Sequence, residues 1–155
     1  MNPENPNLSP KPPSLILKEE KLKEIRKKLE KVTDAVGHPI EQGIKETVVM
    51  FNAFELPTTQ SCEGHTDSHT EEYHPAMSPW VEIYPEEPEQ ENWQYNDELR
   101  KKVEVESDRY LAQVMSLLNE FYQNQNVPDD VKLTTDQIAY GFRVQSSGLE
   151  NLKDP

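Results

Sequence analysis

The sequence predicts an α+β fold in which helices pack on one small, mostly antiparallel sheet. Two helix-spaced apolar stripes open the chain, strand-like segments follow them, and a third long stripe separates two pairs of strands. The predicted order is helix, helix, strand, strand, helix, strand, strand. The 155 residues fit one domain, which we expect over residues 15–155, after a flexible proline-rich tail at residues 1–14.

The first helix is expected over residues 15–36. Its apolar residues recur every seven positions, with two more between them: Leu15, Leu22, Leu29 and Val36, then Ile25 and Val32. Gly37 is suited to the position after the helix, where a positive φ is needed. The heptad spacing, beside several lysines, is also compatible with docking on a partner protein or on a second copy of the chain. Packing on its own domain is the commoner fate of such a stripe.

A second helix is expected to begin near His38-Pro39 and to stop at Leu56-Pro57, because proline disfavours a helical residue before it. Its wide apolar stripe predicts the most buried helix of the fold: Ile40, Ile44, Val48, Val49, Met50, Phe51 and Phe54. The segment Thr58–Ser61 reads as a short strand that leads into a turn. After a polar loop at residues 64–79, Trp80–Tyr84 is the next strand.

The second half of the chain predicts one long helix and two strands. Asn96 or Asp97 can cap a helix that runs to about Asn124. Strands are expected at residues 131–134 and 138–145. In the second of these, alternation places four apolar side chains on one face: Ile138, Tyr140, Phe142 and Val144.

The charge of the chain is unevenly distributed. The net charge is −13, but residues 36–155 hold 8 basic and 23 acidic residues, and no Lys or Arg lies between Lys45 and Arg100. Nucleic-acid affinity depends on cationic contacts with phosphates, so nucleic acid is disfavoured as a partner.

Composition also bears on location. No run approaches the roughly 20 apolar residues of a membrane span, and the first residues lack the basic end and the apolar run of a secretory signal. The single cysteine, Cys62, excludes an intramolecular disulfide. We therefore expect a cytoplasmic protein with no membrane association.

The most distinctive chemistry lies in residues 61–74. Cysteine and three histidines follow the pattern C-x2-H-x3-H-x4-H, which comprises Cys62, His65, His69 and His74. Thiolate and imidazole are the ligands that zinc prefers, and the acidic neighbours favour a bound cation, so these four residues are candidate zinc ligands. Glu63 is a candidate general base beside a metal-bound water. The spacing matches no established zinc finger, and a solvated acidic loop with incidental histidines is the simplest alternative.

A second chemical hypothesis makes Cys62 a nucleophile that His65 activates. A reactive thiolate usually needs a nearby cation, and no Lys or Arg lies within sixteen residues in sequence, although Arg143 or Lys132 could approach in the fold. Cys62, Glu63 and His65 would then form a catalytic group. The plainest alternative is a small, buried structural thiol.

Part of the chain resembles a group of small, uncharacterised bacterial proteins. The shared text is Gly43-Ile44, Thr47-Val48, Asn52-Ala53, Thr59-x-Ser61-Cys62-Glu63-Gly64-His65 and Pro79-Trp80-Val81-x-Ile83. These proteins share a helix, a Thr-x-x-Ser-Cys-Glu-Gly-His turn and a Pro-Trp-Val strand. The resemblance spans residues 38–84 and implies that the turn and the later strand belong to one site, without implying an activity.

A looser resemblance is to the wybutosine-synthesis methyltransferase family. Its motif is Ser-Cys-x-Gly-Arg, which Ser61-Cys62-Glu63-Gly64 matches, with His65 in place of the arginine. The resemblance implies tRNA modification with S-adenosylmethionine. The acidic composition and the lost cation both argue against a tRNA substrate.

The sequence therefore predicts two alternative functions. The first is a small cytosolic metal-binding protein of the zinc type, with hydrolase-like chemistry and its site at residues 61–74. The second is a non-enzymatic interaction protein that docks or self-associates through the helix at residues 15–36.

Overall fold

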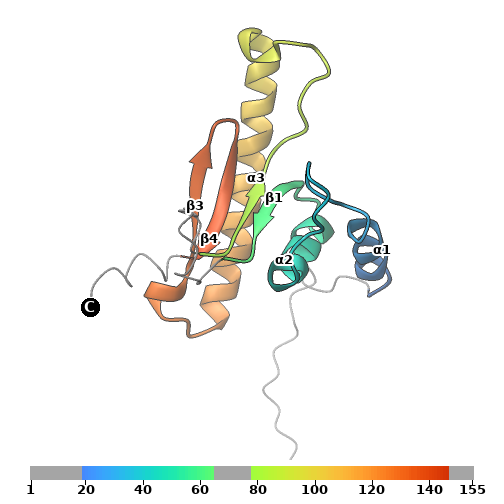
Figure 1. Cartoon of the computed structure of the whole chain (residues 1–155). Coiled ribbons are helices and arrows are strands. Elements are labelled where there is room, and N and C mark those ends of the chain that lie inside the picture. The colour runs from blue at the N-terminus through green and yellow to red at the C-terminus, as the bar shows by residue number, and fades with distance from the viewer. Residues whose placement is uncertain (1–18, 65–77, 147–155) are drawn as a thin grey trace, which may run out of the picture.

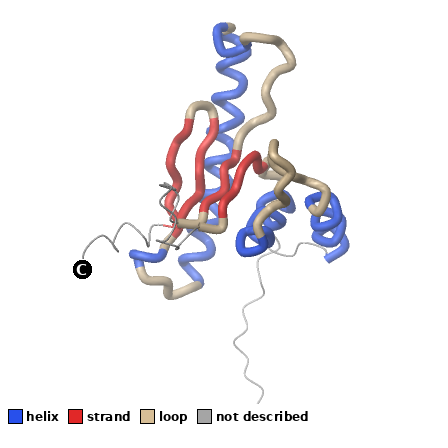
Figure 2. Tube along the Cα trace, in the orientation of Figure 1, coloured by secondary structure: helices blue, strands red, loops and turns tan. Residues whose placement is uncertain are grey.

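The computed structural model describes residues 19–64 and 78–146, and it confirms the predicted α+β class and the order of the elements. The helices and strands are α1 Glu19–Leu29, α2 Gln42–Ala53, β1 Thr58–Cys62, β2 Trp80–Ile83, α3 Asp97–Asn124, β3 Leu133–Ile138 and β4 Gly141–Ser146 (Figures 1 and 2). Two short 3-10 helices, η2 Trp93–Tyr95 and η3 Asp129–Val131, lie in the connections around α3. The predicted tail at residues 1–14 lies outside the described residues.

The four strands form one antiparallel sheet in the order β1-β2-β4-β3, so β1 and β3 are its edges. Val81 and Ile83 of β2 pair with Val144 and Phe142 of β4, and all four side chains are buried on the face that the helices cover. The long helix α3 runs behind the sheet in Figure 1, while α2 and then α1 lie beside β1.

The core has two clusters that meet at Phe51. One contains Leu29, Ile44, Val48, Val49 and Val81, with Leu22 and Ile25 of α1 packed against it. The other joins the sheet to α3 through Leu56, Ile83, Val114, Phe142 and Val144. The prediction that α2 is the most buried helix is confirmed, since four of its twelve residues are buried, against two of 28 in α3.

The first helix is shorter than predicted. It ends at Leu29 rather than at Val36, and Val36 is 77% exposed in the loop that follows. The cause is Asp34, whose Oδ1 accepts the backbone N–H groups of Val36 (3.0 Å) and His38 (2.8 Å) and so competes with helical hydrogen bonds. Gly37 does have a positive φ, of 91°, but it lies within this loop and not at the helix end.

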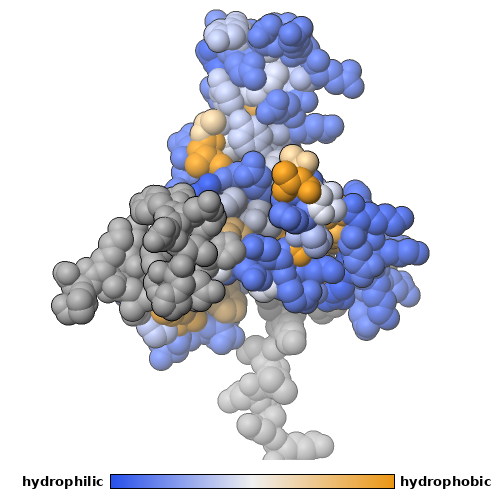
Figure 3. Space-filling view, in the orientation of Figure 1, coloured by the Kyte–Doolittle hydropathy of each residue, from blue (hydrophilic) through white to orange (hydrophobic). Residues whose placement is uncertain are grey.

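The described part of the apolar stripe on α1 packs into the protein's own core. Leu29 is buried there, and Leu22 and Ile25 contact the same cluster. Arg26 ties α1 to α2 through hydrogen bonds from its Nε and Nη2 to the Glu46 carboxylate, at 3.0 and 2.8 Å. The surface over α1 is accordingly almost all hydrophilic on the face shown in Figure 3. The stripe therefore has an intramolecular role that docking through it would disrupt.

Two further boundaries differ from the predictions. The helix expected to start at Pro39 begins at Gln42, because Pro39 forms an isolated β-bridge with Thr33. In the C-terminal hairpin the turn is at Ala139 and Tyr140, where Ala139 has a φ of 40°, so Ile138 ends β3 instead of sharing a strand with Phe142. Alanine rarely adopts a positive φ, so an alanine at this position does not predict a two-residue turn.

The cap of α3 is as predicted. The Asn96 side chain accepts hydrogen bonds from the backbone N–H groups of Glu98 and Leu99, at 3.1 and 3.2 Å. Of the helices within the described ranges, none is both long and apolar enough to cross a bilayer.

Candidate functional site

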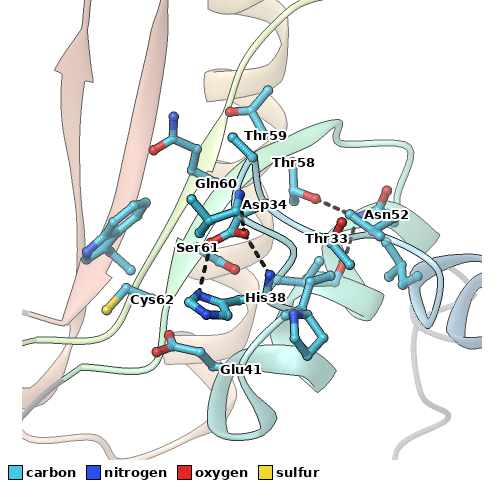
Figure 4. A pocket seen from close by; sticks show the side chains of 18 of the residues that line it. Thr33, Asp34, His38, Glu41, Asn52, Thr58, Thr59, Gln60, Ser61 and Cys62 are labelled. Carbon is cyan, nitrogen blue, oxygen red and sulfur yellow. Dashed lines mark hydrogen bonds and ion pairs between the residues drawn. The ribbon is translucent and has the colours of Figure 1, made fainter.

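A cleft of about 930 Å³ lies between β1 and the segment that connects α1 to α2. All five residues of β1 line one side, from Thr58 to Cys62, and residues 32–36 and 38–41 line the other. Leu29 and Val48 of the core contribute to its lining, and Trp80 lies at the Cys62 end. Figure 4 shows the polar side chains of both walls gathered around this space.

The wall opposite β1 is a loop fixed by its own hydrogen bonds. Besides the two bonds to the Asp34 side chain, the Asp34 N–H donates to the His38 carbonyl at 2.8 Å, and Gly37 N–H donates to the Asp34 carbonyl at 3.1 Å. The backbone N–H of His38 bonded to the carboxylate is the main reason why the pKa of Asp34 is lowered from its ordinary value. The loop is thus shaped independently of any ligand.

Asp34 also contacts the His38 ring. Its Oδ2 lies 3.5 Å from His38 Nδ1, an approach that orients the imidazole within the cleft (Figure 4). The sequence hypotheses did not use His38, which was treated only as the start of a helix. The spacing Asp34-x3-His38, with Gly37 between them, is a signal that a compact turn brings the two side chains together.

At the end of β1, two segments are held together by a reciprocal pair of hydrogen bonds. The N–H of Glu63 donates to Glu41 Oε2 at 2.7 Å, and the N–H of Gly43 donates to Glu63 Oε2 at 2.6 Å. Glu41 is the N-cap residue of α2, yet its side chain does not cap its own helix. Glu63 supplies that cap from the end of β1, in the manner of a capping box divided between two segments. We call this pair of bonds the Glu41–Glu63 lock.

The lock brings the Glu41 carboxylate to the Cys62 thiol. Burial raises the pKa of Cys62, and a hydrogen bond to Glu41 and the negative charges of Glu41 and Glu63 raise it further. Gly64 N–H, 3.4 Å from Cys62 Sγ, acts in the opposite sense. At neutral pH the side chain is therefore a protonated thiol beside a carboxylate, and it is not a resting nucleophilic thiolate.

The predicted site residues are only partly described. Cys62 and Glu63 lie at the end of β1, while His65, His69 and His74 fall outside the described residues. Within residues 19–64 and 78–146 no three Cys, His, Asp or Glu side chains are grouped so that they could hold a metal ion. Glu63, the predicted general base, has its carboxylate engaged by the N-terminus of α2.

Arg143, one of the two cations that could have activated Cys62, has another role. Arg143 Nη2 donates to Glu82 Oε1 at 2.5 Å, and its guanidinium lies 4.1 Å from the centre of the Trp80 ring. The interactions that shift the Cys62 pKa include Glu41 and Glu63 as the charged groups. Lys132, the other candidate, donates from its Nζ to Asp129 Oδ1 at 2.5 Å. Within the described residues, therefore, no cation is among the groups that shift the Cys62 pKa, and nothing there supports the nucleophile hypothesis.

No protein-family model, curated protein or solved structure matches this chain. The chemistry and geometry of the cleft are therefore the basis for assigning a function.

Proposed function

We propose that this protein binds a zinc-type metal ion at the Cys62 end of the cleft. The observation that supports the proposal is geometric: the Glu63 N–H, one residue after the Cys62 thiol, donates to Glu41 Oε2 at 2.7 Å and so brings the Glu41 carboxylate to the Cys62 end of the cleft (Figure 4). These groups come from segments 21 positions apart and provide one sulfur and one oxygen ligand, a combination suited to zinc.

The electrostatics of this corner favour a cation. The same acidic groups that keep a proton on Cys62 would stabilise a divalent ion in place of that proton. Metal binding would then release the thiol proton, and affinity would rise with pH. The Glu41–Glu63 lock holds both ligands in position before any metal arrives, which lowers the cost of assembling the site.

The remaining ligands in the proposal are inferred from their position in the sequence. His65, His69 and His74 follow Cys62 closely, and two of them would complete a tetrahedral set with Cys62 and Glu41. Glu63 is a positioning residue in this proposal, because its carboxylate caps α2. The proposal therefore concerns metal binding and includes no hydrolytic step.

The test measures metal content and sulfur ligation directly. Protein purified without a histidine tag is analysed for metals, and the metal-free protein is then titrated with Co²⁺, whose bond to a thiolate gives a charge-transfer absorption. We expect a stoichiometric metal and this absorption in the wild type, and the loss of both in Cys62→Ser. His65→Ala should weaken binding, whereas His38→Ala, which removes an imidazole from the opposite wall, is the matched control and should not.

Two results would refute the proposal. One is a protein whose metal content and stability are unchanged by both Cys62→Ser and His65→Ala. The other is Co²⁺ binding without a sulfur absorption, which would place the ion elsewhere on this acidic chain. Either result would leave Cys62 as a buried thiol hydrogen-bonded to Glu41.

A further inference from the structure

The outer edge of β1 forms one wall of the cleft. β1 pairs with β2 alone, so on its other side it has no strand partner in the part of the chain that the structure describes. Thr59 and Gln60 are exposed along this edge. Alternate backbone N–H and C=O groups of such a strand point outward, where they can pair with another strand.

The space beside this edge is the cleft, which lies between the strand and a loop of fixed shape. The cleft follows β1 along its whole length, and the opposite wall at residues 33–39 is fixed by the Asp34 hydrogen bonds. Its volume of about 930 Å³ is at the upper end of the range, about 300–1,000 Å³, in which proteins bind ligands. At the Thr58 end, Asn52 Nδ2 donates to Thr58 Oγ1 at 2.8 Å and holds the strand against α2.

We propose that the β1 edge binds an extended peptide segment of another protein that carries a basic side chain, and that this segment adds a strand to the sheet. In this mode the main-chain hydrogen bonds provide affinity, and the side chains on alternate positions provide selectivity. The proposal is separate from metal binding and does not require an ion at Cys62.

Charge complementarity identifies the occupant. The cleft lining includes the carboxylates of Asp34 and Glu41, and among the described residues that line it Lys28 is the one Lys or Arg. The Asp34 side chain is 52% exposed, so it can reach a ligand while its Oδ1 holds the loop. Residues 36–155 carry 23 acidic against 8 basic residues, and a field of this sign speeds the approach of a cationic segment.

The length of the paired segment is limited by an irregularity in β1. The register with β2 shifts between Thr58 and Gln60, which marks a bulge, and pairing is regular from Gln60 to Cys62. A bulge in an edge strand restricts open-ended sheet growth. We therefore expect a short segment to pair with Gln60–Cys62, with its flanking residues lying against the 33–39 wall.

The experiment uses random heptapeptides displayed on phage and selected on the full chain. The best selected peptide is synthesised with a fluorophore, and its affinity is measured by anisotropy. We expect it to contain Lys or Arg and to bind more weakly as salt rises. N-methylation of backbone amides should weaken binding about tenfold or more at alternate positions only, because each methyl group removes one strand hydrogen bond and adds bulk.

Protein variants locate the binding site. Asp34→Asn removes the charge but keeps the Oδ1 acceptor that shapes the loop, and it should weaken the basic peptide about two- to five-fold, the range of an exposed ion pair. Asp108→Asn makes the same change on α3, away from the cleft lining, and should leave affinity unchanged. Cys62→Ser changes only a buried side chain and leaves the main chain that pairs with the peptide, so peptide binding should persist, which separates this proposal from metal binding.

Four results of the peptide experiments would overturn the inference. In the first two, the selection returns no peptide that prefers this protein to an unrelated acidic protein, or only peptides without a basic residue. In the other two, the selected peptide tolerates N-methylation at every position, or Asp34→Asn and Asp108→Asn change its affinity equally. A dimer of the peptide-free chain, with the amides of Gln60–Cys62 protected from exchange, would also overturn it, because the occupant would then be a second copy.

Discussion

Gly43→Ala is expected to destabilise the protein, although the same change in an ordinary helix is stabilising. Alanine is favoured over glycine by about 1 kcal/mol in a helix interior and by less in the first turn, where Gly43 lies. At this position, however, an added Cβ would lie 2.6 Å from Glu63 Oε2 and 3.1 Å from Glu63 Cβ. The Glu63 carboxylate must move away, and the bond that Gly43 N–H donates to it is lost.

The expected change in the free energy of unfolding is the balance of these two opposing effects. A hydrogen bond to a charged group contributes about 1.5–3 kcal/mol, and the exposure of Glu63 reduces this to about 1–2 kcal/mol. A gain in helix propensity of about 0.5 kcal/mol leaves a net loss of about 0.5–1.5 kcal/mol. The free energy of unfolding is measured in urea, with the fluorescence of Trp80 and Trp93 as the signal.

A double-mutant cycle tests whether the loss of stability in Gly43→Ala depends on the Glu63 side chain. In a Glu63→Ala background the carboxylate, its 2.6 Å clash and its hydrogen bond are absent, and only the 3.1 Å contact with the Cβ of residue 63 remains, so Gly43→Ala should no longer lower the free energy of unfolding. Gly37→Ala is the matched control. An alanine at position 37 would be strained by the φ of 91°, and its Cβ would have nothing within 4 Å. Gly37→Ala should therefore lower the free energy of unfolding by the same amount in both backgrounds. A stabilising Gly43→Ala in the wild-type background would show that Glu63 does not cap α2.

Three further predictions concern the core, the thiol and the loop. Val48→Ala, at a core residue 2% exposed, should lower the free energy of unfolding by about 1–3 kcal/mol in urea, and a change near zero would place α2 at the surface. Because burial and the Glu41 carboxylate raise the pKa of Cys62, its alkylation at pH 7–8 should be about tenfold or more slower than that of an exposed thiol, and an equal rate would contradict the described burial. The lowered pKa of Asp34 means that its bonds to the loop are fully present above its ordinary pKa of 3.8 and are lost as pH falls through the lowered value. The amide NMR shifts of Val36 and His38 should report this acid transition in the wild type, and its persistence in Asp34→Asn would refute the assignment.

Periodicity in the sequence was sufficient to predict the fold class and the order of the elements along the chain. The stripe from Ile44 to Phe51, the long helix capped by Asn96 and the strand at Trp80 all follow from regular spacing of apolar residues or from local capping chemistry. The errors occurred where a side chain or a backbone conformation overrode that periodicity. Val36 continues the heptad of α1, but its backbone N–H donates to the Asp34 carboxylate and not to a helical carbonyl, so the helix does not extend to Val36.

The candidate site was predicted less completely, because its parts meet only in the fold. Cys62 and the turn after it were identified from unusual residue types close together in sequence. Glu41, Asp34 and His38 were missed, since nothing local indicates that the connection between α1 and α2 lies along the edge of β1. Glu63 was identified as a candidate general base, and nothing in the sequence indicated that its carboxylate also caps a helix that begins 21 positions earlier in the chain.

Glu41 links the two proposed activities, which determines how they can be separated. Its carboxylate accepts the Glu63 N–H, acts on the Cys62 thiol and lines the cleft beside β1. Glu41→Gln would therefore disturb the lock, the proposed metal ligand and the charge of the cleft at once, and a loss of function in it would not discriminate between them. The Cys62 and Asp34 side chains lie on opposite walls and each serve one proposal, because peptide pairing uses only the main chain of Cys62, so Cys62→Ser and Asp34→Asn are the informative pair. If either variant abolished both metal and peptide binding, the two activities would share one site, and the assignment of the Cys62 and Asp34 side chains to separate activities would be wrong.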